Sequence, residues 1–320
     1  MIVKFIQNLF FVVIIFSSNY LMAQNNDSIR QDHKHQICIF NSMRVINGHS
    51  ASILKRNELN FNLTQRFGDM GSNGTPTIGL GLDSIADMRL GLAFGLWNKL
   101  TIGIGRSKGI GPFTQIADGY IKYNLIKSKN PSSQLRTNGF PDSGISYSAS
   151  LLQTMAYTFM KESADTTLST SFAGKNVRRM AYSSQLLLNT NMYDKFNVLL
   201  SPTYVHRNYV AFEDKNGLFS CGIAVQYKVC KWFGVSAEYF QNFRKSNSIL
   251  GVNYKNPLAV GFVFNYHETN FNFTIGNSAG IGETQFLPYT SGELKNGQLK
   301  MGFTLSHSLQ FLYNPVRLHV

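Results

Sequence analysis

The sequence predicts an all-β protein, namely a single antiparallel transmembrane β-barrel of about 12 strands with short periplasmic turns and longer extracellular loops. Three observations favour this class. The 320 residues are 43% hydrophobic and 13% aromatic but only 15% charged. Apolar and polar residues alternate over long stretches, and short and long connections alternate along the chain. The mean hydropathy is −0.11, and no segment after the N-terminus approaches the roughly 20 apolar residues of a membrane helix. A helical membrane protein is therefore excluded.

The N-terminus has the features of a secretory signal peptide. Lys4 precedes an apolar run from Leu9 to Phe16, and Ala23 supplies a small residue before a cut. We therefore expect export to the bacterial outer membrane, with the barrel-assembly machinery and outer-membrane lipid as partners. The expected parts are a signal peptide over 1–23, a periplasmic N-terminal segment over 24–57, the barrel over 58–311 and a C-terminal tail over 312–320.

Alternation with a period of two marks the strands. From Leu218 to Cys230, apolar residues alternate with polar or small ones, as in a long strand with one apolar face. Several such stretches reach the roughly 9 to 11 residues that cross a bilayer at a tilt. The whole chain contains twelve predicted strands. Because this number is even, the first and last strands begin and end on the same side of the membrane. The predicted strands are 58–67, 86–96, 100–106, 117–127, 144–159, 179–192, 196–205, 217–229, 233–243, 257–267, 270–277 and 298–311.

The connections support the same architecture. Very short polar turns at 97–99, 193–195, 230–232 and 267–269 alternate with longer connections, and 127–143 is the one long connection on the short side. Aromatic residues close to the turns are expected to form an interfacial girdle, with an ordinary core position as the alternative for each. The girdle candidates are Trp97, Tyr193, Trp232, Phe233 and Phe271.

Residues 41–131 contain a series of short motifs. They include Asn47-Gly48-His49-Ser50, Arg66-Phe67-Gly68 at a strand end, Gly81-Leu82-Asp83, Gly105-Arg106-Ser107 and Lys122-Tyr123. In these residues the sequence resembles a Bacteroidota outer-membrane β-barrel family catalogued as domain of unknown function 5777, although Gln65 stands where that family more often has His. The resemblance implies an outer-membrane barrel without an assigned reaction. Its motif residues of unknown role are Asn47, Gly48, His49, Arg66, Gly68 and Asp83.

The charge surplus gives the strongest indication of function. Lys and Arg number 30 against 17 acidic residues, and loss of Lys4 with the signal peptide leaves a net charge of about +12. A positive lumen would favour small anionic solutes. The alternative is that the cations pair with Asp87, Asp118 and Glu238 inside a plugged barrel. The candidates for lining the lumen are Arg89, Arg106, Lys122, Lys228 and Lys300. Because the basic residues are dispersed, nucleic-acid binding is disfavoured.

Three classes of function remain open at this point. The leading one is a passive channel or uptake barrel for small solutes, anionic ones in particular. The second is a plugged structural or partner-binding barrel. A barrel lipid hydrolase is the least favoured, because it needs a Ser and a His brought together from neighbouring strands. The clusters His49-Ser50 and Ser306-His307-Ser308 cannot form a dyad alone, since adjacent strand residues point to opposite faces. We therefore predict no enzyme.

Cofactor and metal sites are not expected either. Asp32-His33-Lys34-His35 is weak evidence for a metal, because two imidazoles two residues apart lack a third strong ligand. The three cysteines, Cys38, Cys221 and Cys230, are an odd number at unpatterned spacing. A bridge between the last two is conceivable, but both fit better as small apolar strand residues.

Overall fold

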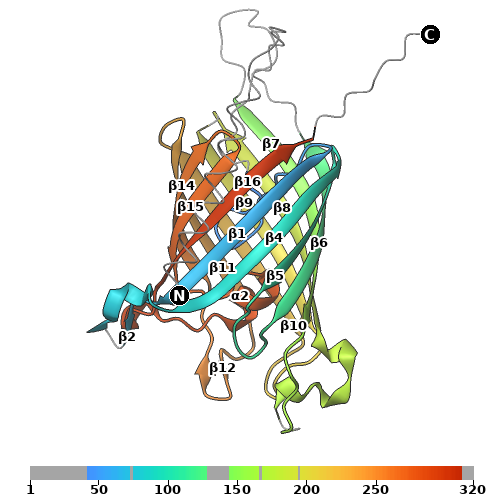
Figure 1. The fold of residues 1–320 in the computed structure, drawn as a ribbon, viewed down its shortest axis with the longest axis vertical. Helices are drawn as coiled ribbons and strands as arrows, with labels where there is room; N and C mark the ends of the chain where they lie inside the picture. The colour runs from blue at the N-terminus through green and yellow to red at the C-terminus, as the bar shows by residue number, and fades with distance from the viewer. Residues whose placement is uncertain (1–41, 73–74, 128–143, 166–167, 194, 312–320) are drawn as a thin grey trace, which may run out of the picture. The chain divides into compact units, whose positions relative to one another are not determined.

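A computed structural model describes residues 42–72, 75–127, 144–165, 168–193 and 195–311, and these form a closed barrel of twelve antiparallel strands (Figure 1). Each barrel strand pairs with the next along the chain, and the last pairs back with the first. The strands are β1 (Glu58–Asp69), β4 (Ile85–Trp97), β5 (Leu100–Ser107), β6 (Ile116–Lys127), β7 (Ile145–Thr158), β8 (Met180–Met192), β9 (Phe196–Arg207), β10 (Gly217–Lys228), β11 (Phe233–Phe243), β14 (Leu258–Tyr266), β15 (Thr269–Gly276) and β16 (Lys300–Gln310). The predicted fold class is confirmed, and every predicted strand end lies within two residues of the observed one.

Closure leaves no unpaired strand edge in the barrel. β1 and β16 pair from Glu58 opposite Gln310 to Asp69 opposite Lys300, so the backbone groups of the first and last strands satisfy each other. In a membrane this matters because an unpaired N–H or C=O costs several kcal/mol, as an order of magnitude, where water is absent. The chain therefore crosses with every strand paired on both sides.

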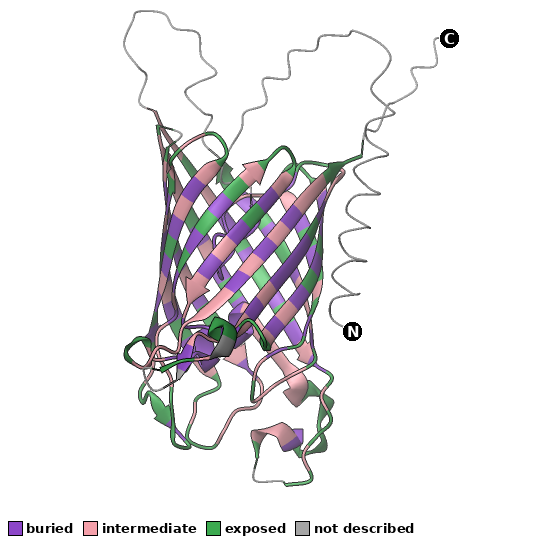
Figure 2. Cartoon of the chain, turned by 60° about the vertical axis from the view of Figure 1, so that its left-hand side comes forward, coloured by how far each residue is buried: buried purple, intermediate pink, exposed green. Residues whose placement is uncertain are grey.

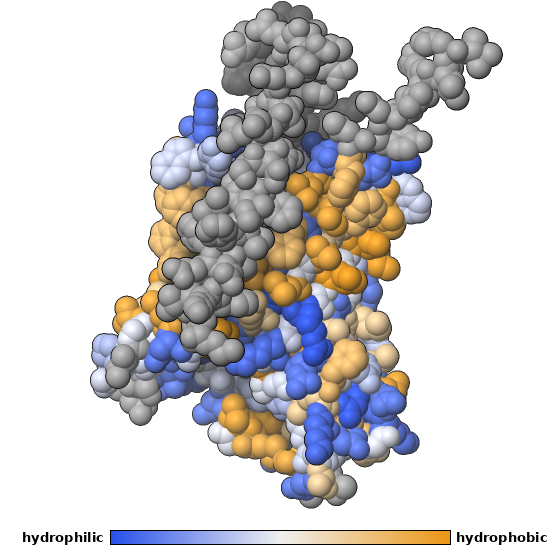
Figure 3. Space-filling model, in the orientation of Figure 1, coloured by the Kyte–Doolittle hydropathy of each residue, from blue (hydrophilic) through white to orange (hydrophobic). Residues whose placement is uncertain are grey.

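The wall has two chemically different faces. Along β10, Ser220 is fully buried whereas its neighbour Phe219 is 49% exposed, and this alternation repeats around the barrel as the banding in Figure 2. Figure 3 shows apolar residues covering the wall towards the end that carries the short turns, which we call the short-turn end. The opposite, long-loop end is more polar on the face shown. The outward positions are thus mostly apolar, and the inward positions are polar, small or, as at Leu152 and Leu187, part of a buried apolar core.

The long-loop end carries the short elements between the barrel strands. None of the helices in the described ranges is long and apolar enough to cross a membrane. These elements are the two-residue strands β2 (Gly71–Ser72), β3 (Thr75–Pro76), β12 (Ser248–Ile249) and β13 (Val252–Asn253), the 3-10 helices η1 (Ile78–Gly81), η3 (Ser169–Gly174), η4 (Asn176–Arg179) and η5 (Leu294–Asn296), and the helix α2 (Glu283–Tyr289). Every residue of α2 is buried, because this helix lies inside the outline of the barrel (Figure 1).

Residues 42–57 are called here the lumen hairpin; they lie inside the barrel except at its end, where Lys55 and Arg56 are exposed. Arg44 bridges His49 across the hairpin, and the Val45 N–H donates to the Gly48 carbonyl at 2.9 Å, which closes the turn. All of residues 42–51 are buried. We expected 24–57 to be a periplasmic segment, so the structure corrects that assignment for 42–57, whose polar groups find their partners on the barrel's inner face. Residues 1–41 and 312–320 lie outside the described residues, and the signal peptide and tail stay predictions.

Small residues on the inner face make room for the hairpin. A Cβ added to Gly103 on β5 would come within 2.3 Å of the Tyr120 ring, which packs against His49 with ring centroids 4.8 Å apart. At Gly119, one residue before Tyr120, the nearest atom to such a Cβ is 3.7 Å away. The glycine at 103 is therefore required by close packing, while the glycine at 119 is not.

We predict that Gly103→Ala destabilises the barrel by about 1–3 kcal/mol, the usual range for overpacking a filled interior. The loss of the folded, heat-modifiable band on electrophoresis should move to lower temperature. Gly119→Ala is the matched control and should leave that temperature unchanged. Equal effects of the two substitutions would contradict the packing of Tyr120 against the lumen hairpin.

Candidate functional site

The turn of the lumen hairpin rests on a single carboxylate of the wall. Glu238 faces inward from β11 and is only 3% exposed. Its Oε1 accepts the Asn47 N–H at 3.1 Å, and its Oε1 and Oε2 accept the Gly48 N–H at 3.2 and 3.1 Å. A Cβ on Gly48 would lie 3.0 Å from Phe240 and 3.3 Å from Oε2, so a glycine permits this close approach. An ionised acceptor makes each of these bonds stronger than a neutral one.

Arg66 binds the same turn from the first strand. Its Nη2 donates to Asn47 Oδ1 at 3.0 Å, and the guanidinium is 3% exposed. The sequence motif residues Asn47, Gly48 and Arg66 therefore meet in one place, although 17 residues separate the last two. The structure gives them a shared role in seating the hairpin.

Lys122 holds the two legs of the hairpin together. This lysine of β6 has no exposed surface, and its Nζ donates to the carbonyls of Ser50 and Ser52 at 3.0 and 3.1 Å and approaches that of Met43 at 3.5 Å. The carbonyls come from both legs of the hairpin. A buried ammonium without partners is very costly, so Lys122 in this position stabilises the closed hairpin, which supplies its partners.

Further wall residues bind the hairpin from other sides of the bore. Thr101 Oγ1 accepts the Leu54 N–H at 2.9 Å, Ser150 Oγ donates to the Ala51 carbonyl at 2.9 Å, and Asn272 Nδ2 donates to the Val45 carbonyl at 2.7 Å. These three wall residues lie on β5, β7 and β15, and the preceding contacts come from β1, β6 and β11. The hairpin is therefore bound across the full width of the lumen.

His49 joins the hairpin to α2. It is 2% exposed, neither ring nitrogen has a hydrogen-bond partner, and Nε2 lies 3.7 Å from Glu283 Oε1. Arg44 Nη1 approaches the same carboxylate at 3.5 Å and donates to the Ile281 carbonyl at 3.0 Å. Burial, with the added repulsion of Arg44, Lys122 and Arg89, holds the pKa of His49 well below its usual value. The imidazole is thus neutral while the hairpin is closed.

The helix α2 blocks the lumen on the long-loop side of the hairpin. Phe286 packs against Phe240 of the wall with centroids 5.1 Å apart, and Asn242 Nδ2 donates to the Leu287 carbonyl at 2.8 Å. Gln285 Oε1 accepts the Ile110 N–H at 3.1 Å from the connection between β5 and β6. The hairpin and α2 therefore both occupy the bore.

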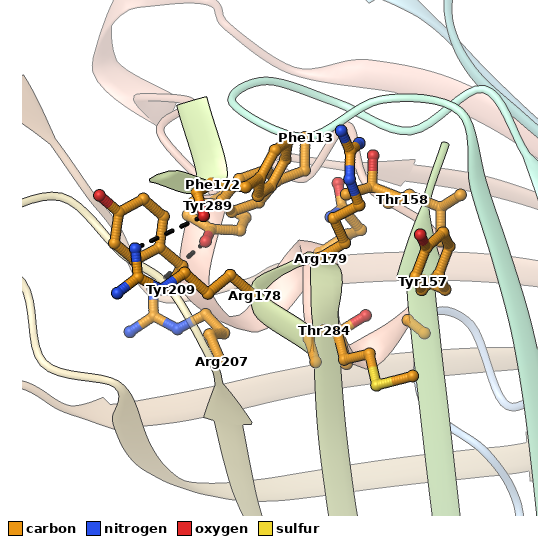
Figure 4. A pocket seen from close by; sticks show the side chains of 15 residues that line it. Phe113, Tyr157, Thr158, Phe172, Arg178, Arg179, Arg207, Tyr209, Thr284 and Tyr289 are labelled. Carbon is orange, nitrogen blue, oxygen red and sulfur yellow. Dashed lines mark hydrogen bonds between the residues drawn. The ribbon is translucent and has the colours of Figure 1, made fainter. Parts of the chain in front are cut away.

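An arginine cluster, defined as Arg178, Arg179, Arg207 and Arg244, lies at the long-loop end. Figure 4 shows the first three with Tyr209, Phe172 and Tyr289 around the pocket they line. Arg178 lies over Tyr209 at 4.7 Å and Arg179 over Phe172 at 4.4 Å, measured from the guanidinium carbon to the ring centroid.

The two innermost arginines, Arg207 and Arg244, share the carboxylate of Asp214. Arg207 Nη1 donates to Asp214 Oδ2 at 2.6 Å, and Arg244 Nη1 is 3.9 Å from Oδ1 of the same side chain. Arg207 Nε and Arg244 Nε and Nη1 are buried without a hydrogen-bond partner. The cluster therefore carries unused donors and more positive than negative charge. Its cavity has a volume of about 20 Å³, which is room for a single water molecule.

The structure places most of the predicted lumen residues on the inner side. Arg89 binds Asp118 through Nε at 2.9 Å and Nη2 at 2.5 Å, Lys122 binds the hairpin, and Lys300 Nζ donates to Asp69. Lys228 takes an inward register position at the end of β10 and is partly exposed. Arg89 and Lys300 are thus paired with acids and Lys122 is bound to backbone carbonyls.

Arg106 is a correction, because it lies on the outer face of β5 and is exposed. The inward positions beside it are Gly103 and Gly105, which leave room for the side chains of Tyr120 and Arg89. The arginine consequently shares the outward face with Ile102 and Ile104.

The girdle candidates face outward at the short-turn end. Trp97, Tyr193 and Trp232 are 61%, 67% and 60% exposed. Phe233 and Phe271 each pair with Phe264 on the same outer face, with centroids 5.1 and 6.4 Å apart. Their placement suits an interfacial girdle, which stays a prediction.

Other predicted features have simpler surroundings. Gly68 donates its N–H to the Ser84 carbonyl at 2.9 Å, and Asp83 is exposed in the following loop. His307 Nδ1 lies 2.9 Å from Thr269 Oγ1, whereas Ser306 points inward to Asn60. Cys221 and Cys230 are free thiols. Asp32-His33-Lys34-His35 and Cys38 lie outside the described residues.

Sequence reasoning missed Arg44, Glu283 and the arginine cluster, because the role of each depends on contacts between distant segments.

A family model described as a membrane-bound β-barrel domain, domain of unknown function 5777, matches residues 40–309. The chain belongs to this family, and the resemblance noted over 41–131 extends over nearly the whole barrel. This agrees with the predicted location in the outer membrane. The expected Bacteroidota source stays a prediction.

Several solved structures are similar barrels at low sequence identity. No curated protein matches the chain. Among solved structures, the NanC porin has a TM-score of 0.43 and 8% identity, covering 79% of this chain and 100% of its own. The KdgM porin, solved in complex with disordered oligogalacturonate, has a TM-score of 0.41 and 9% identity, and the match covers 80% of this chain and 99% of the porin. An outer-membrane channel from Pseudomonas putida F1 has a TM-score of 0.43 and 12% identity, and the match covers 81% of this chain and 97% of the channel. All three are outer-membrane porins or channels, and they assign no solute to this chain.

We predict that Glu238→Gln loosens the lumen hairpin. The substitution removes the charge and one of the two acceptor oxygens, and a lost bond to a buried charged group costs about 1–3 kcal/mol. Hydrogen exchange of the amides at 44–50 should therefore quicken by about tenfold or more. Glu293→Gln is the control, because Glu293 pairs with Lys255 at the protein surface. Unchanged exchange in the Glu238 variant would show that the carboxylate does not hold the turn.

Acid should also open the hairpin. Because the pKa of His49 is lower in the closed state than the roughly 6.5 of a free imidazole, the open state binds more protons, and closure weakens as pH falls below that value. Amide exchange at 44–50 should rise between pH 7.5 and pH 5, beyond the change in intrinsic rate. In His49→Gln this extra rise should disappear. A pH response that survives the substitution would assign it to another group.

Proposed function

We propose that this protein is an uptake barrel for small anionic solutes whose bore is closed by the lumen hairpin and opens when the hairpin is displaced. The observation that carries the proposal is the way the hairpin is bound. Its apolar residues, such as Met43 and Ile46, pack in one core with wall residues such as Leu152, and its polar contacts include hydrogen bonds of its backbone with Glu238 and Lys122. Such bonds can be exchanged for water without unfolding a strand.

The barrel itself does not need the hairpin for closure. Its twelve strands pair with one another, and the backbone hydrogen bonds of residues 42–54 with other backbone groups lie within the hairpin. Beside apolar residues such as Leu152 and Leu187, the inner face carries many polar ones, such as Asn60, Thr64 and Ser220. A polar inner face can be wetted once the hairpin leaves, as in water-filled barrels. This arrangement supports a wall that stays folded in both states.

The arginine cluster supports an anionic solute. At the long-loop end, the buried Arg207 and Arg244 have unused donors and lie over the rings of Tyr289 and Tyr254. Guanidinium groups bind carboxylates and phosphates through two parallel hydrogen bonds. The 20 Å³ cavity is too small for such a solute, so binding requires α2 or the neighbouring loops to move.

The second candidate function is a closed barrel that binds a partner. The buried ion pairs inside the bore favour it. Arg89 and Asp118, for example, neutralise each other, as expected for charges in an interior that stays filled. An enzyme is disfavoured, since Ser306 binds Asn60, His307 lies beside Thr269 and neither ring nitrogen of His49 has a hydrogen-bond partner. Both candidates share the closed state and differ in whether it can open.

We predict that the mature protein is silent in planar bilayers and that deletion of residues 24–53 produces stable conductance steps. The deletion removes the residues bound by Glu238 and Lys122 but keeps Leu54, which leads into β1. In a potassium chloride gradient the reversal potential should show anion preference. Arg244→Gln in the deletion variant should reduce that preference, because it removes a cation from the long-loop entrance.

Heat-modifiable migration of the deletion variant confirms that the barrel has folded before conductance is measured. A folded deletion variant without conductance would reject the uptake barrel and favour the partner-binding barrel. Steady conductance of the intact mature protein would reject closure by the hairpin.

A further inference from the structure

A groove on the outer wall of the barrel is lined by two basic residues, Arg106 and Lys108, that do not face the bore. It lies where β4 and β5 approach the long-loop end and has a volume of about 490 Å³. Met88 and Leu90 of β4 line one side. Arg106 and Lys108, with Ser107, Thr114 and Gln115, line the rest. The groove therefore combines an apolar wall with two basic side chains.

The apolar side of the groove continues into the lipid-facing surface of the barrel. Leu90 and Leu92 on β4 are 45% and 43% exposed, and Ile104 on β5 is 64% exposed. Leu90 pairs directly with Arg106 across the two strands. On β5 the outward residues thus change from isoleucine to arginine towards the long-loop end. This is the position where hydrocarbon gives way to headgroups at one side of a bilayer.

The two cations are available for an anion. Neither Arg106 nor Lys108 forms an ion pair with an acidic side chain in the part of the chain that the structure describes. Arg106 donates one bond to the Gln115 carbonyl at 2.9 Å and lies 5.2 Å from the Phe159 ring centroid. Lys108 Nζ donates to the Ile85 carbonyl at 2.6 Å. These contacts orient both groups along the groove and leave further N–H donors unused, because a guanidinium has five and an ammonium three.

We propose that this groove binds the phosphate headgroup of an anionic membrane lipid, with an acyl chain lying along Leu90 and Leu92. The groove's cations are complementary to a phosphate, and its apolar wall is continuous with the surface that acyl chains cover. A free phosphate would use the cations but would gain nothing from that wall. The lipid site is independent of whether the bore opens.

The test is lipid binding by native mass spectrometry of the mature protein in mild detergent, titrated with dioleoylphosphatidylglycerol. The double variant Arg106→Gln, Lys108→Gln should bind this lipid about tenfold more weakly, since it loses charge-assisted bonds to the phosphate. The control is Lys99→Gln, Lys231→Gln, which removes the same charge from exposed positions at the short-turn end. The control should bind as the unaltered protein does.

Three outcomes would overturn the proposal. Equal weakening in both double variants would mean that only overall charge matters. Unchanged binding in the groove variant would place the lipid elsewhere. Displacement of the lipid by millimolar inorganic phosphate, with no contribution from the acyl chains, would make the groove a free-phosphate site. Because both groove residues face outward, heat-modifiable migration of the variant should remain normal.

Discussion

The closed bore depends on one constraint: the buried backbone groups of the lumen hairpin must find hydrogen-bond partners within the hairpin or on the wall. Residues 42–51 are buried, so their backbone N–H and C=O groups cannot rely on bulk water. Glu238 supplies acceptors to the turn, and Lys122 supplies donors to the two legs. Each of these side chains would itself be a costly buried charge without the hairpin. Wall and hairpin therefore stabilise each other, and loss of either contact weakens closure.

The distribution of charge follows from this constraint. Inside the bore the described residues include four cations and four acids. The cations are Arg44, Arg66, Arg89 and Lys122, and the acids are Asp87, Asp118, Glu238 and Glu283. The interior is thus close to neutral, which matches the plugged-barrel alternative raised from the sequence. Part of the surplus of positive charge lies instead at the long-loop end, in the arginine cluster, and on the outer wall at Arg106 and Lys108.

The barrel could be predicted from the sequence because its signal is local. Alternation along a strand such as β10 reflects the difference between lipid and lumen, and each strand carries that pattern by itself. The lumen hairpin could not be predicted in this way. Its residues show no period of two, and its partners Lys122 and Glu238 lie far along the chain. The prediction that Arg106 faces the lumen was wrong for a related reason. Glycines face inward on β5 because they make room for Tyr120 and Arg89, and this packing is visible only in the structure.

The central claim is that the hairpin occupies the bore of the native protein, and one contact tests it without altering the chain. His49 on the hairpin and Tyr120 on the wall have ring centroids 4.8 Å apart. Nuclear Overhauser spectroscopy of the refolded mature protein in micelles, at pH 7.5, should therefore show a cross-peak between the two rings. Resolved signals from both rings with no cross-peak would place the hairpin outside the bore and contradict the account.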